Sequence, residues 1–390
     1  MKAVTTHQGT LSVVDIPDPR PGKGQVLLEV VRTGICGSDL HARVHADVQA
    51  EDARTVGYDD FMRVADEVVM GHELLGRVIS YGPKTRKAWK PGTRVVAMPI
   101  LTVDGTTHLT GLTPKAPGGY AELVLAEESL TFEVPDTVPD DMAVLTEPLS
   151  VANHAVRRAR ISKADPALVI GCGPIGLAVI LMLKARGVKK VVASDLSPGR
   201  RDLARACGAD VVVDPRISSP YDAIGKHRGV ITTLPDLLGL AVGSMKALRA
   251  VPLLPWGTLM RTADRLGQTP RGPVVFECVG VPGMIDRVIS ETPLRTRVVV
   301  VGVCMEPDTF HPSMAITKEL ELVFTIYYDP AEYAESLAMI ADGRIDPRPL
   351  HTGTVGLDGV AGAFEALAHP EVHAKILIDP HRPGSGVVEV

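Results

Sequence analysis

The sequence predicts an α/β protein of two domains, one rich in β-strands and one built on a parallel sheet. Up to about residue 150, short β-branched runs alternate with Gly/Pro turns, a pattern typical of a partly closed barrel or a sandwich. Beyond that point strands alternate with helical stretches, which indicates parallel βαβ units. The length of 390 residues is ample for two hydrophobic cores.

In the first region, short apolar runs separated by turn-forming dipeptides predict β-strands. Pro91-Gly92 and Gly82-Pro83 are two of these turns, since Gly and Pro favour the backbone angles of tight reversals. The strands predicted between such turns cover residues 26–31, 76–79, 93–97 and 121–125.

The second region repeats a strand–helix pattern, and the tail adds two further helices. Asp329-Pro330 predicts the start of one tail helix, because proline is tolerated in the first helical turn. We expect the tail to return to the first domain, which gives domains 1–149 completed by 328–390, and 150–327 with an insertion at about 221–266. The remaining predicted elements are strands 167–170, 191–194, 211–213, 273–277, 297–301 and 374–378, and helices 176–185 and 203–207.

Composition excludes several classes of function. A net charge of −5 and a pI near 6.2 argue against nucleic-acid or membrane-surface binding. No uninterrupted apolar run reaches the roughly 18 residues of a membrane span, and no targeting core follows Met1. The cysteines are odd in number and scattered, which favours reduced thiols and a cytoplasmic location over a disulfide framework.

A glycine-rich turn between a predicted strand and a predicted helix indicates a dinucleotide site. Gly171 permits the tight turn, Gly173 lets backbone N–H groups approach a pyrophosphate, and Gly176 lets helix and strand pack closely. The helix N-terminus adds partial positive charge for the phosphates. The cofactor-binding residues predicted from this turn are Gly171, Gly173, Pro174, Ile175 and Gly176.

Asp195 stands 24 residues after Gly171, at the end of the second predicted strand. A carboxylate there accepts hydrogen bonds from the ribose hydroxyls and repels a 2′-phosphate, so NAD is favoured over NADP. Arg200 and Arg201 follow closely and could soften this preference, and Arg200 is a further candidate cofactor contact. The alternative is that Asp195 caps the helix that begins near Ser197-Pro198.

Three residues in the first fifth of the chain have side chains that bind zinc. Cys36 offers a thiolate, His72 an imidazole and Glu73 a carboxylate, the ligand types of an open zinc site. Taken singly, each has a simpler explanation, because a lone Cys is commonly a small core residue and a lone His a structural one. Their combination with neighbouring polar residues makes a metal site the favoured interpretation.

Five motifs together resemble the zinc-dependent medium-chain alcohol dehydrogenase family, and they occur along the chain in the family's order. The branch that is most similar holds sorbitol, threonine and butanediol dehydrogenases, in which Glu-Pro-Leu replaces a cysteine ligand. The resemblance implies a β-rich GroES-like catalytic domain and a Rossmann-type doubly wound parallel sheet. The motifs are Gly34-Ile35-Cys36-Gly37-Ser38-Asp39-Leu40-His41, Gly71-His72-Glu73, Gly118-Gly119-Tyr120-Ala121-Glu122, Glu147-Pro148-Leu149-Ser150 and Gly171-Cys172-Gly173-Pro174-Ile175-Gly176.

The resemblance also implies roles for individual residues. Cys36, His72 and Glu147 are the implied zinc ligands, and Glu73 is the residue that can replace or supplement one of them. Asp39 is expected to orient His72. The alternative for Glu147 is a surface carboxylate on a helix.

Ser38 and His41 are the implied proton relay of that site. Ser38 would pass the proton of the alcohol through the nicotinamide ribose, and His41 would deliver it to solvent. The alternative for His41 is a solvent-exposed or loop-packing histidine.

Two departures from the family pattern alter these expectations. Many relatives carry a second, structural zinc on four closely spaced cysteines, but residues 98–117 contain none. We therefore expect one catalytic zinc, no structural zinc, and a plain polar loop at 102–117. A segment at 43–67 is longer than in the family and makes Tyr58, Phe61 and Met62 candidate pocket residues.

The insertion at 221–266 is rich in Leu, Gly and Pro and includes Trp256. It is either a hydrophobic subunit contact, a flap over the cleft, or a helical excursion packed on its own domain. Family resemblance suggests a homodimer or homotetramer, with 297–302 as a candidate contact.

Together these observations predict a zinc- and NAD-dependent oxidoreductase that acts on a secondary alcohol, polyol or amino alcohol, or on the matching ketone. One alternative is a metal-free enzyme similar to quinone reductases, although those lack the Cys36/His72/Glu147 set. The other is a non-catalytic NAD-binding protein on the same scaffold.

Overall fold

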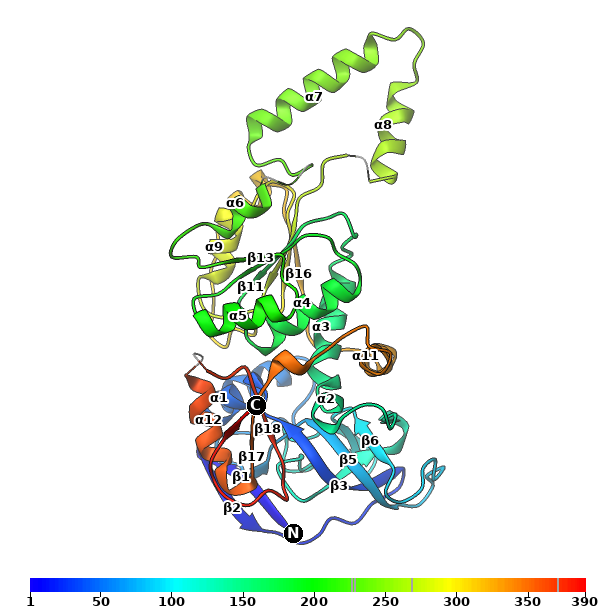
Figure 1. Cartoon of the computed structure of the whole chain (residues 1–390), viewed down its shortest axis with the longest axis vertical. Coiled ribbons are helices and arrows are strands. Elements are labelled where there is room, and N and C mark those ends of the chain that lie inside the picture. The colour runs from blue at the N-terminus through cyan, green and yellow to red at the C-terminus, as the bar shows by residue number, and fades with distance from the viewer. Residues whose placement is uncertain (226, 228, 268, 370–371) are drawn as a thin grey trace. The chain divides into compact units, whose positions relative to one another are not determined.

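A computed structural model describes residues 1–225, 227, 229–267, 269–369 and 372–390 (Figure 1). The chain divides into two compact units. Unit 1 comprises Met1–His154, Gly173–Met182 and Tyr327–Val390, and unit 2 comprises Ala155–Cys172 and Leu183–Ile326. Among the described residues, no helix combines the length and apolar character that crossing a bilayer demands.

The main sheet of unit 1 is mixed and centres on one long strand. This strand, β3, pairs antiparallel with β5, β9 and β18, so the C-terminal tail joins the sheet formed by the first part of the chain. Within the path β10-β6-β5-β3-β18-β17-β19, only β17 and β18 pair in parallel. The strands are β3 (Gln25–Gly34), β5 (Glu73–Tyr81), β6 (Arg94–Ala97), β9 (Leu123–Glu127), β10 (Thr131–Glu133), β17 (His351–Val355), β18 (Lys375–Ile378) and β19 (Val388–Glu389).

Two small sheets complete the β-structure of unit 1. One has the order β2-β1-β4, with β1 (Lys2–His7), β2 (Thr10–Asp15) and β4 (Val68–Val69). The other is a hairpin of β7 (Ile100–Val103) and β8 (Thr106–Leu109). The polar loop expected at 102–117 was therefore wrong in part. Asp104 and Gly105 both have positive φ, 49° and 85°, and this Asp-Gly pair forms the two-residue hairpin turn that a right-handed strand twist favours.

Helices also pack in unit 1, and the first of them accounts for part of the 43–67 segment. The first half of the 43–67 segment, up to Thr55, extends α1, whose helix is kinked at His45. Met62, expected at a substrate pocket, is only 1% exposed and belongs to a hydrophobic cluster with Tyr120 and Phe364; it is a core residue. The helices are α1 (Gly37–Thr55), α2 (Asp140–Ala143), α3 (Thr146–Arg158), α11 (Pro330–Ala341) and α12 (Val360–Ala368), with 3-10 turns at Glu128–Leu130, Arg348–Leu350 and Leu357–Gly359.

Unit 2 is built on a six-stranded parallel sheet in the order β13-β12-β11-β14-β15-β16. This is the order 3-2-1-4-5-6 of a doubly wound sheet, whose direction of winding reverses between β11 and β14. The strands, almost all apolar, are β11 (Ala167–Ile170), β12 (Val191–Ser194), β13 (Val211–Val213), β14 (Val274–Glu277), β15 (Arg297–Val300) and β16 (Glu321–Phe324). Because β15 is paired on both sides, its backbone offers no free edge to another subunit.

Most of the connecting helices in this part of the chain are short, and α4 begins directly after the glycine-rich turn. The expected insertion contains α7 and α8, neither of which has a buried residue. They project from the strands of unit 2 as a helical arm (Figure 1), so the alternative of an excursion packed on its own domain is wrong. The helices are α4 (Pro174–Ala185), α5 (Pro198–Ala206), α6 (Pro220–Gly225), α7 (Leu234–Arg249), α8 (Trp256–Arg265), α9 (Met284–Glu291) and α10 (Pro312–Thr317).

Candidate metal centre and dinucleotide turn

Cys36 lies where β3 gives way to α1. Its backbone is extended, with φ −93° and ψ 153°, and it occupies the position just before the first helical turn. The backbone N–H of Cys36 donates to Asp39 Oδ2 at 2.9 Å, so the carboxylate of the third helical residue satisfies a donor that the helix leaves free. This contact fixes the half-buried thiol at the end of the strand.

His72 is held by a close approach of two backbone segments. Gly71 has φ +100°, and a Cβ at this position would lie 2.4 Å from Tyr120 Cδ1, so only glycine fits there. The Nδ1 atom of His72 lies 3.1 Å from Asp39 Oδ1, and Asp39 Oδ2 also accepts a 2.6 Å bond from the Tyr120 hydroxyl. With Nδ1 directed at the carboxylate, Nε2 is left to serve as a metal ligand.

The Asp39–His72 contact shifts the pKa values of both groups. Burial alone would raise the pKa of Asp39, but the His72 ring and the hydrogen bonds from His72, Tyr120 and Cys36 outweigh it and lower that pKa. Burial likewise opposes the charged form of His72, yet Asp39 and Cys36 raise its pKa well above the ordinary value. A carboxylate that favours positive charge on the ring also makes the ring a stronger donor to a metal ion.

Glu73 follows His72 directly and is fully buried. Its carboxylate lies over the backbone of Gly34, where a Cβ would approach Glu73 Oε2 to 1.7 Å. Lys375 Nζ forms an ion pair with Glu73 Oε1 and donates to the carbonyl of Ile35 at 2.9 Å. In the described part of the chain, Glu73 Oε2 has no hydrogen-bond partner, which leaves one buried oxygen available as a ligand.

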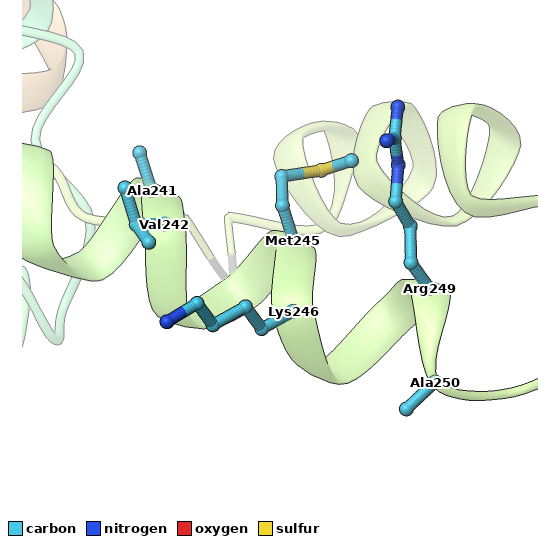
Figure 2. A pocket seen from close by; sticks show the side chains of 6 residues that line it. All are labelled: Ala241, Val242, Met245, Lys246, Arg249 and Ala250. Carbon is cyan, nitrogen blue, oxygen red and sulfur yellow. The ribbon is translucent and has the colours of Figure 1, made fainter.

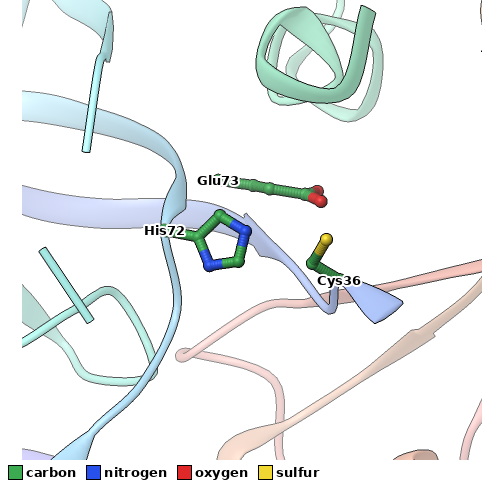
Figure 3. Close-up of side chains that lie close together, drawn as sticks. All are labelled: Cys36, His72 and Glu73. Atoms are coloured by element: carbon green, nitrogen blue, oxygen red, sulfur yellow. The ribbon is translucent and has the colours of Figure 1, made fainter. Parts of the chain in front are cut away.

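Three of the predicted site residues converge. One ligand atom from each of Cys36, His72 and Glu73 lies within 4.8 Å of the others, and Figure 3 shows these side chains turned toward one another. A thiol, an imidazole and an unsatisfied carboxylate oxygen form a donor set that suits Zn²⁺. The residues therefore fit the metal that the sequence predicts.

Glu147 lies in the first turn of α3 and is 6% exposed, so it is not a surface carboxylate. It stands outside the three-residue cluster but close enough to interact with His72, Glu73 and Lys375. Burial raises its pKa to about 7; Glu73 adds to this, whereas His72, Lys375 and a hydrogen bond with Tyr328 oppose it. A buried carboxylate that is costly to ionise gains most from a nearby cation.

Ser38 and His41 occupy the first two turns of α1. Residues three apart in a helix lie on neighbouring positions of one face, so both extend from the same side of α1. Ser38 is partly buried and His41 is exposed. Desolvation and the charge of His45 lower the pKa of His41.

The glycine-rich turn follows β11 at the point where the sheet order reverses. Gly171 has φ +87°, and a Cβ there would lie 2.7 Å from Val279 Cγ2, so the tight turn expected at Gly171 requires glycine. Cys172 is buried. The strand, turn and helix follow one another as predicted, but the helix α4 begins at Pro174, two residues before the predicted start at Gly176.

Asp195 directly follows β12, and its carboxylate accepts two backbone hydrogen bonds, from Cys172 N at 2.7 Å and from Ser197 N at 2.8 Å. It is not the cap of α5; Ser197 is, and its side chain accepts from Arg200 N. Arg201 Nη1 donates a hydrogen bond to the Asp195 carbonyl at 2.9 Å and forms an ion pair with the Asp214 carboxylate at 3.1 Å. This leaves Arg200 as the arginine next to the turn. Burial raises the pKa of the Cys172 thiol, and the positive charge of Arg200 acts in the opposite direction.

Sequence reasoning missed three residues that shape the metal centre: Lys375, Tyr120 and Tyr328. Lys375 had a readable signal, since it is the one cation in the apolar strand run 374–378 and a buried cation requires a partner. Tyr120 carries a sequence signal only as a member of the Gly118–Glu122 motif. Burial and the Glu147 carboxylate raise the pKa of Tyr328 well above its ordinary value, but the sequence around Tyr328 carries no comparable signal.

Comparison with known proteins agrees with this geometry. Residues 22–136 match the alcohol dehydrogenase GroES-like domain, and residues 174–251 match the zinc-binding dehydrogenase family. The first match contains Cys36, His72 and Glu73, and the second contains the helix that follows the glycine-rich turn.

Whole-chain relatives extend the match. The chain is 29% identical to (R,R)-butanediol dehydrogenase of Bacillus subtilis, over 98% of this chain and all of the relative. It is 28% identical to sorbitol dehydrogenase of Bos taurus, over 94% of this chain and 92% of the relative. The crystal structure of the Bacillus subtilis 2R,3R-butanediol dehydrogenase superimposes with a TM-score of 0.73 at 28% identity, covering 97% of this chain and 99% of the other. With its fold, its cysteine–histidine–glutamate cluster and these full-length relatives, the chain belongs to the zinc-dependent medium-chain alcohol dehydrogenase family, in the branch of butanediol and sorbitol dehydrogenases.

Proposed function

We propose that this alcohol dehydrogenase-type enzyme holds one catalytic zinc ion and transfers a hydride between a secondary alcohol or polyol and NAD. Membership in the family makes it an oxidoreductase. The substrate class follows from relatives that are named for vicinal diols and sugar alcohols. A small-molecule alcohol, or the matching ketone in the reverse direction, is thus the proposed partner.

The observation that carries this proposal is the convergence of Cys36, His72 and Glu73 within 4.8 Å. An unsatisfied buried carboxylate oxygen and a histidine already oriented by Asp39 are features of a metal centre, not of a plain core. A metal-free reductase would have no use for them. Neither would a protein that only binds NAD.

Cys36, His72 and Glu147 would hold the zinc, and Glu73 would supplement or replace one of them. When bound, Zn²⁺ supplies Lewis-acid polarisation of the substrate oxygen. Glu147 gains its charged form beside the ion, because burial otherwise raises its pKa to about 7. Asp39 keeps the His72 ring in place through the 3.1 Å contact.

Ser38 and His41 would carry the alcohol proton from the site toward solvent. Ser38 is partly buried and His41 is exposed on the same face of α1, an arrangement that leads outward. The lowered pKa of His41, caused by desolvation and by His45, keeps its ring neutral and able to accept a proton near neutral pH.

Gly171, Gly173, Pro174, Ile175, Gly176, Asp195 and Arg200 would bind the dinucleotide. NAD is proposed over NADP because Arg201 is already paired with Asp214 at 3.1 Å and Asp195 carries a negative charge where a 2′-phosphate would sit. Structures that share this fold at 22–23% identity include one in complex with NADH and one bound to NADP.

We further propose that residues 1–149 with 328–390 act as the catalytic domain and 150–327 as the NAD-binding domain. A cytoplasmic location agrees with five free cysteines. A homo-oligomer is proposed as the working form.

Metal analysis combined with a substrate screen tests the function. Purified protein is loaded with Zn²⁺, dialysed, and assayed with NAD against secondary alcohols, vicinal diols, sugar alcohols and amino alcohols. About one zinc per chain and activity that a chelator abolishes are expected. Zinc-free protein after loading, or activity that survives complete zinc removal, contradicts the proposal.

A further inference from the structure

The arm formed by α7 and α8 exposes apolar side chains along its whole length. Neither helix has a buried residue, and on α7 the exposed fractions are 57% for Leu238, 44% for Leu240 and 56% for Val242. On α8, Trp256 and Leu259 are each 42% exposed. Single exposed apolar residues are ordinary, but a group of exposed apolar side chains on one element commonly marks an interaction site.

Local interactions at both ends nevertheless stabilise the helix α7. Thr233 caps its start by accepting from Asp236 N, and Lys246 and Arg249 in the last turn suit the negative end of the helix dipole. Arg249 also lies over the ring of Trp256, 5.8 Å from its centroid, which ties the two helices of the arm together. The arm is thus a built element whose outer face lacks a partner in the described chain.

One face of α7 combines small residues with two opposite charges. At 100° per residue, Gly239 and Gly243 lie at the centre of this face, with Asp236 and Lys246 one turn beyond them on either side. Nothing lies within 4 Å of a Cβ built on either glycine, so the face is open to close approach of another backbone. The adjoining groove, shown in Figure 2, is lined by Ala241, Val242, Met245, Lys246, Arg249 and Ala250.

The order of charges on this face is complementary to itself when reversed. Asp236 and Lys246 lie equally far, five residues each, from Ala241, and Gly239 and Gly243 lie two residues from it. Suppose that two copies of α7 pack antiparallel, with a two-fold axis passing at the level of Ala241. Asp236 of each copy then lies opposite Lys246 of the other copy. In the described residues of one chain Lys246 forms no ion pair, and the Asp236 carboxylate forms a hydrogen bond only with the Thr233 hydroxyl.

We propose that the arm is a self-association surface on which α7 packs antiparallel against α7 of a second copy of this chain. The glycines let the two backbones approach, the exposed apolar side chains Leu240 and Val242 are removed from water, and two symmetric Asp236–Lys246 pairs set the register. A two-fold pair of this kind is closed, so it yields a dimer or joins dimers into a tetramer instead of a filament.

A charge-swap series tests the proposal by sedimentation velocity over a range of protein concentrations. Asp236→Lys and Lys246→Asp each place like charges opposite one another, and each is expected to weaken one association step by about tenfold or more. The double variant Asp236→Lys/Lys246→Asp restores the pairs and is expected to recover the wild-type association. Because the single Asp236→Lys and the double variant share the same loss of helix-capping charge, recovery in the double variant cannot come from helix stability.

Cross-linking provides a second readout that is independent of affinity. The variant Asp236→Cys/Lys246→Cys should form dimers on a non-reducing gel after mild oxidation, whereas either single cysteine variant, with the same five native cysteines, should not. Ten residues of helix separate the two new thiols by about 15 Å within one chain, too far for an internal disulfide. The proposal is overturned if no charge variant alters the association seen in the wild type, or if the cross-link does not form. Neither result bears on zinc content or activity.

Discussion

Lys375 and Glu73 form an ion pair in the interior of unit 1, with side-chain exposures of 1% and 0%. The two residues lie 302 positions apart and connect β18 to the first residue of β5. Lys375 also donates to the Ile35 carbonyl at 2.9 Å, one residue before Cys36. A single cation therefore holds both the carboxylate and the strand end from which the candidate metal centre is built.

Removal of Lys375 should destabilise the protein strongly. Lys375→Met leaves the Glu73 carboxylate buried without its partner, and loss of one member of a buried pair costs about 3–5 kcal/mol. The free energy of unfolding, measured with urea, should fall by that order. Lys184→Met is the matched control, because Lys184 pairs with Asp210 at 2.9 Å while both are about one-third exposed, and it should cost under about 1 kcal/mol. Equal effects of the two variants would show that the buried pair contributes no more than a surface one.

Asp39→Asn should weaken zinc binding without removing a ligand. The neutral amide no longer supports the His72 ring electrostatically, and loss of such a partner commonly lowers metal affinity about 10–100-fold. Competition with a chromogenic chelator measures the change. Asp60→Asn removes a comparable carboxylate, 3.4 Å from His108 Nδ1, outside the cluster, and should leave zinc affinity unchanged. A normal affinity in Asp39→Asn would exclude the orienting role.

Glu147→Gln and Glu73→Gln should separate the two candidate carboxylate ligands. We expect Glu147→Gln to lower zinc affinity by at least about a hundredfold, since a ligand contributes more than a residue that only orients one. Glu73→Gln should retain measurable zinc, because Lys375 already neutralises Glu73. Zinc per chain after dialysis against a weak chelator decides between them. Full zinc and activity in Glu147→Gln would remove Glu147 from the ligand set.

The rate of alcohol oxidation should fall below pH 6.5. Desolvation and His45 lower the pKa of His41 from its ordinary value of 6.5, so the ring stays neutral above that pH and becomes protonated only below it. Protonated His41 cannot accept the alcohol proton, and kcat should fall there.

Two variants test whether His41 causes this acid limb. His45→Asn removes the neighbouring charge and should shift the limb upward. His41→Gln should slow oxidation by up to about a hundredfold, with partial rescue by added imidazole. An unchanged pH profile in both variants would contradict the relay.

Asp195→Asn should relax the preference for NAD. The amide keeps an acceptor for Cys172 N, now 2.7 Å from the carboxylate, but no longer repels a 2′-phosphate. The ratio of kcat/KM for NADP to that for NAD should rise about tenfold or more, which corresponds to about 1.4 kcal/mol. Asp202→Asn, an exposed aspartate on α5, is the control. An unchanged ratio would show that other residues set cofactor choice.

Much of the parallel sheet could be predicted because its signals are local. Strands 191–194 and 211–213 coincide with β12 and β13, and Asp329 caps α11 by accepting from Glu332 N. The hairpin β7–β8 was missed although Asp104-Gly105 is a recognised turn sequence and β7, Ile-Leu-Thr-Val, is mostly apolar. Only β8, Thr-Thr-His-Leu, is too polar to suggest a strand. The length of α1 was missed because the buried stripe of the helix consists of alanines, Ala42, Ala46 and Ala50, whose small side chains give only a weak periodic signal.

The sequence by itself determined the fold class, the glycine-rich turn and the ligand types, because each depends on residues adjacent in the chain and on backbone conformation. It could not determine which charges meet in the interior. Lys375 reaches Glu73, and Tyr120 reaches Asp39, only after strands distant in sequence pair in register. Burial then removes water as an alternative partner, so tertiary packing alone decided which oxygen of the cluster remains free for a metal ion.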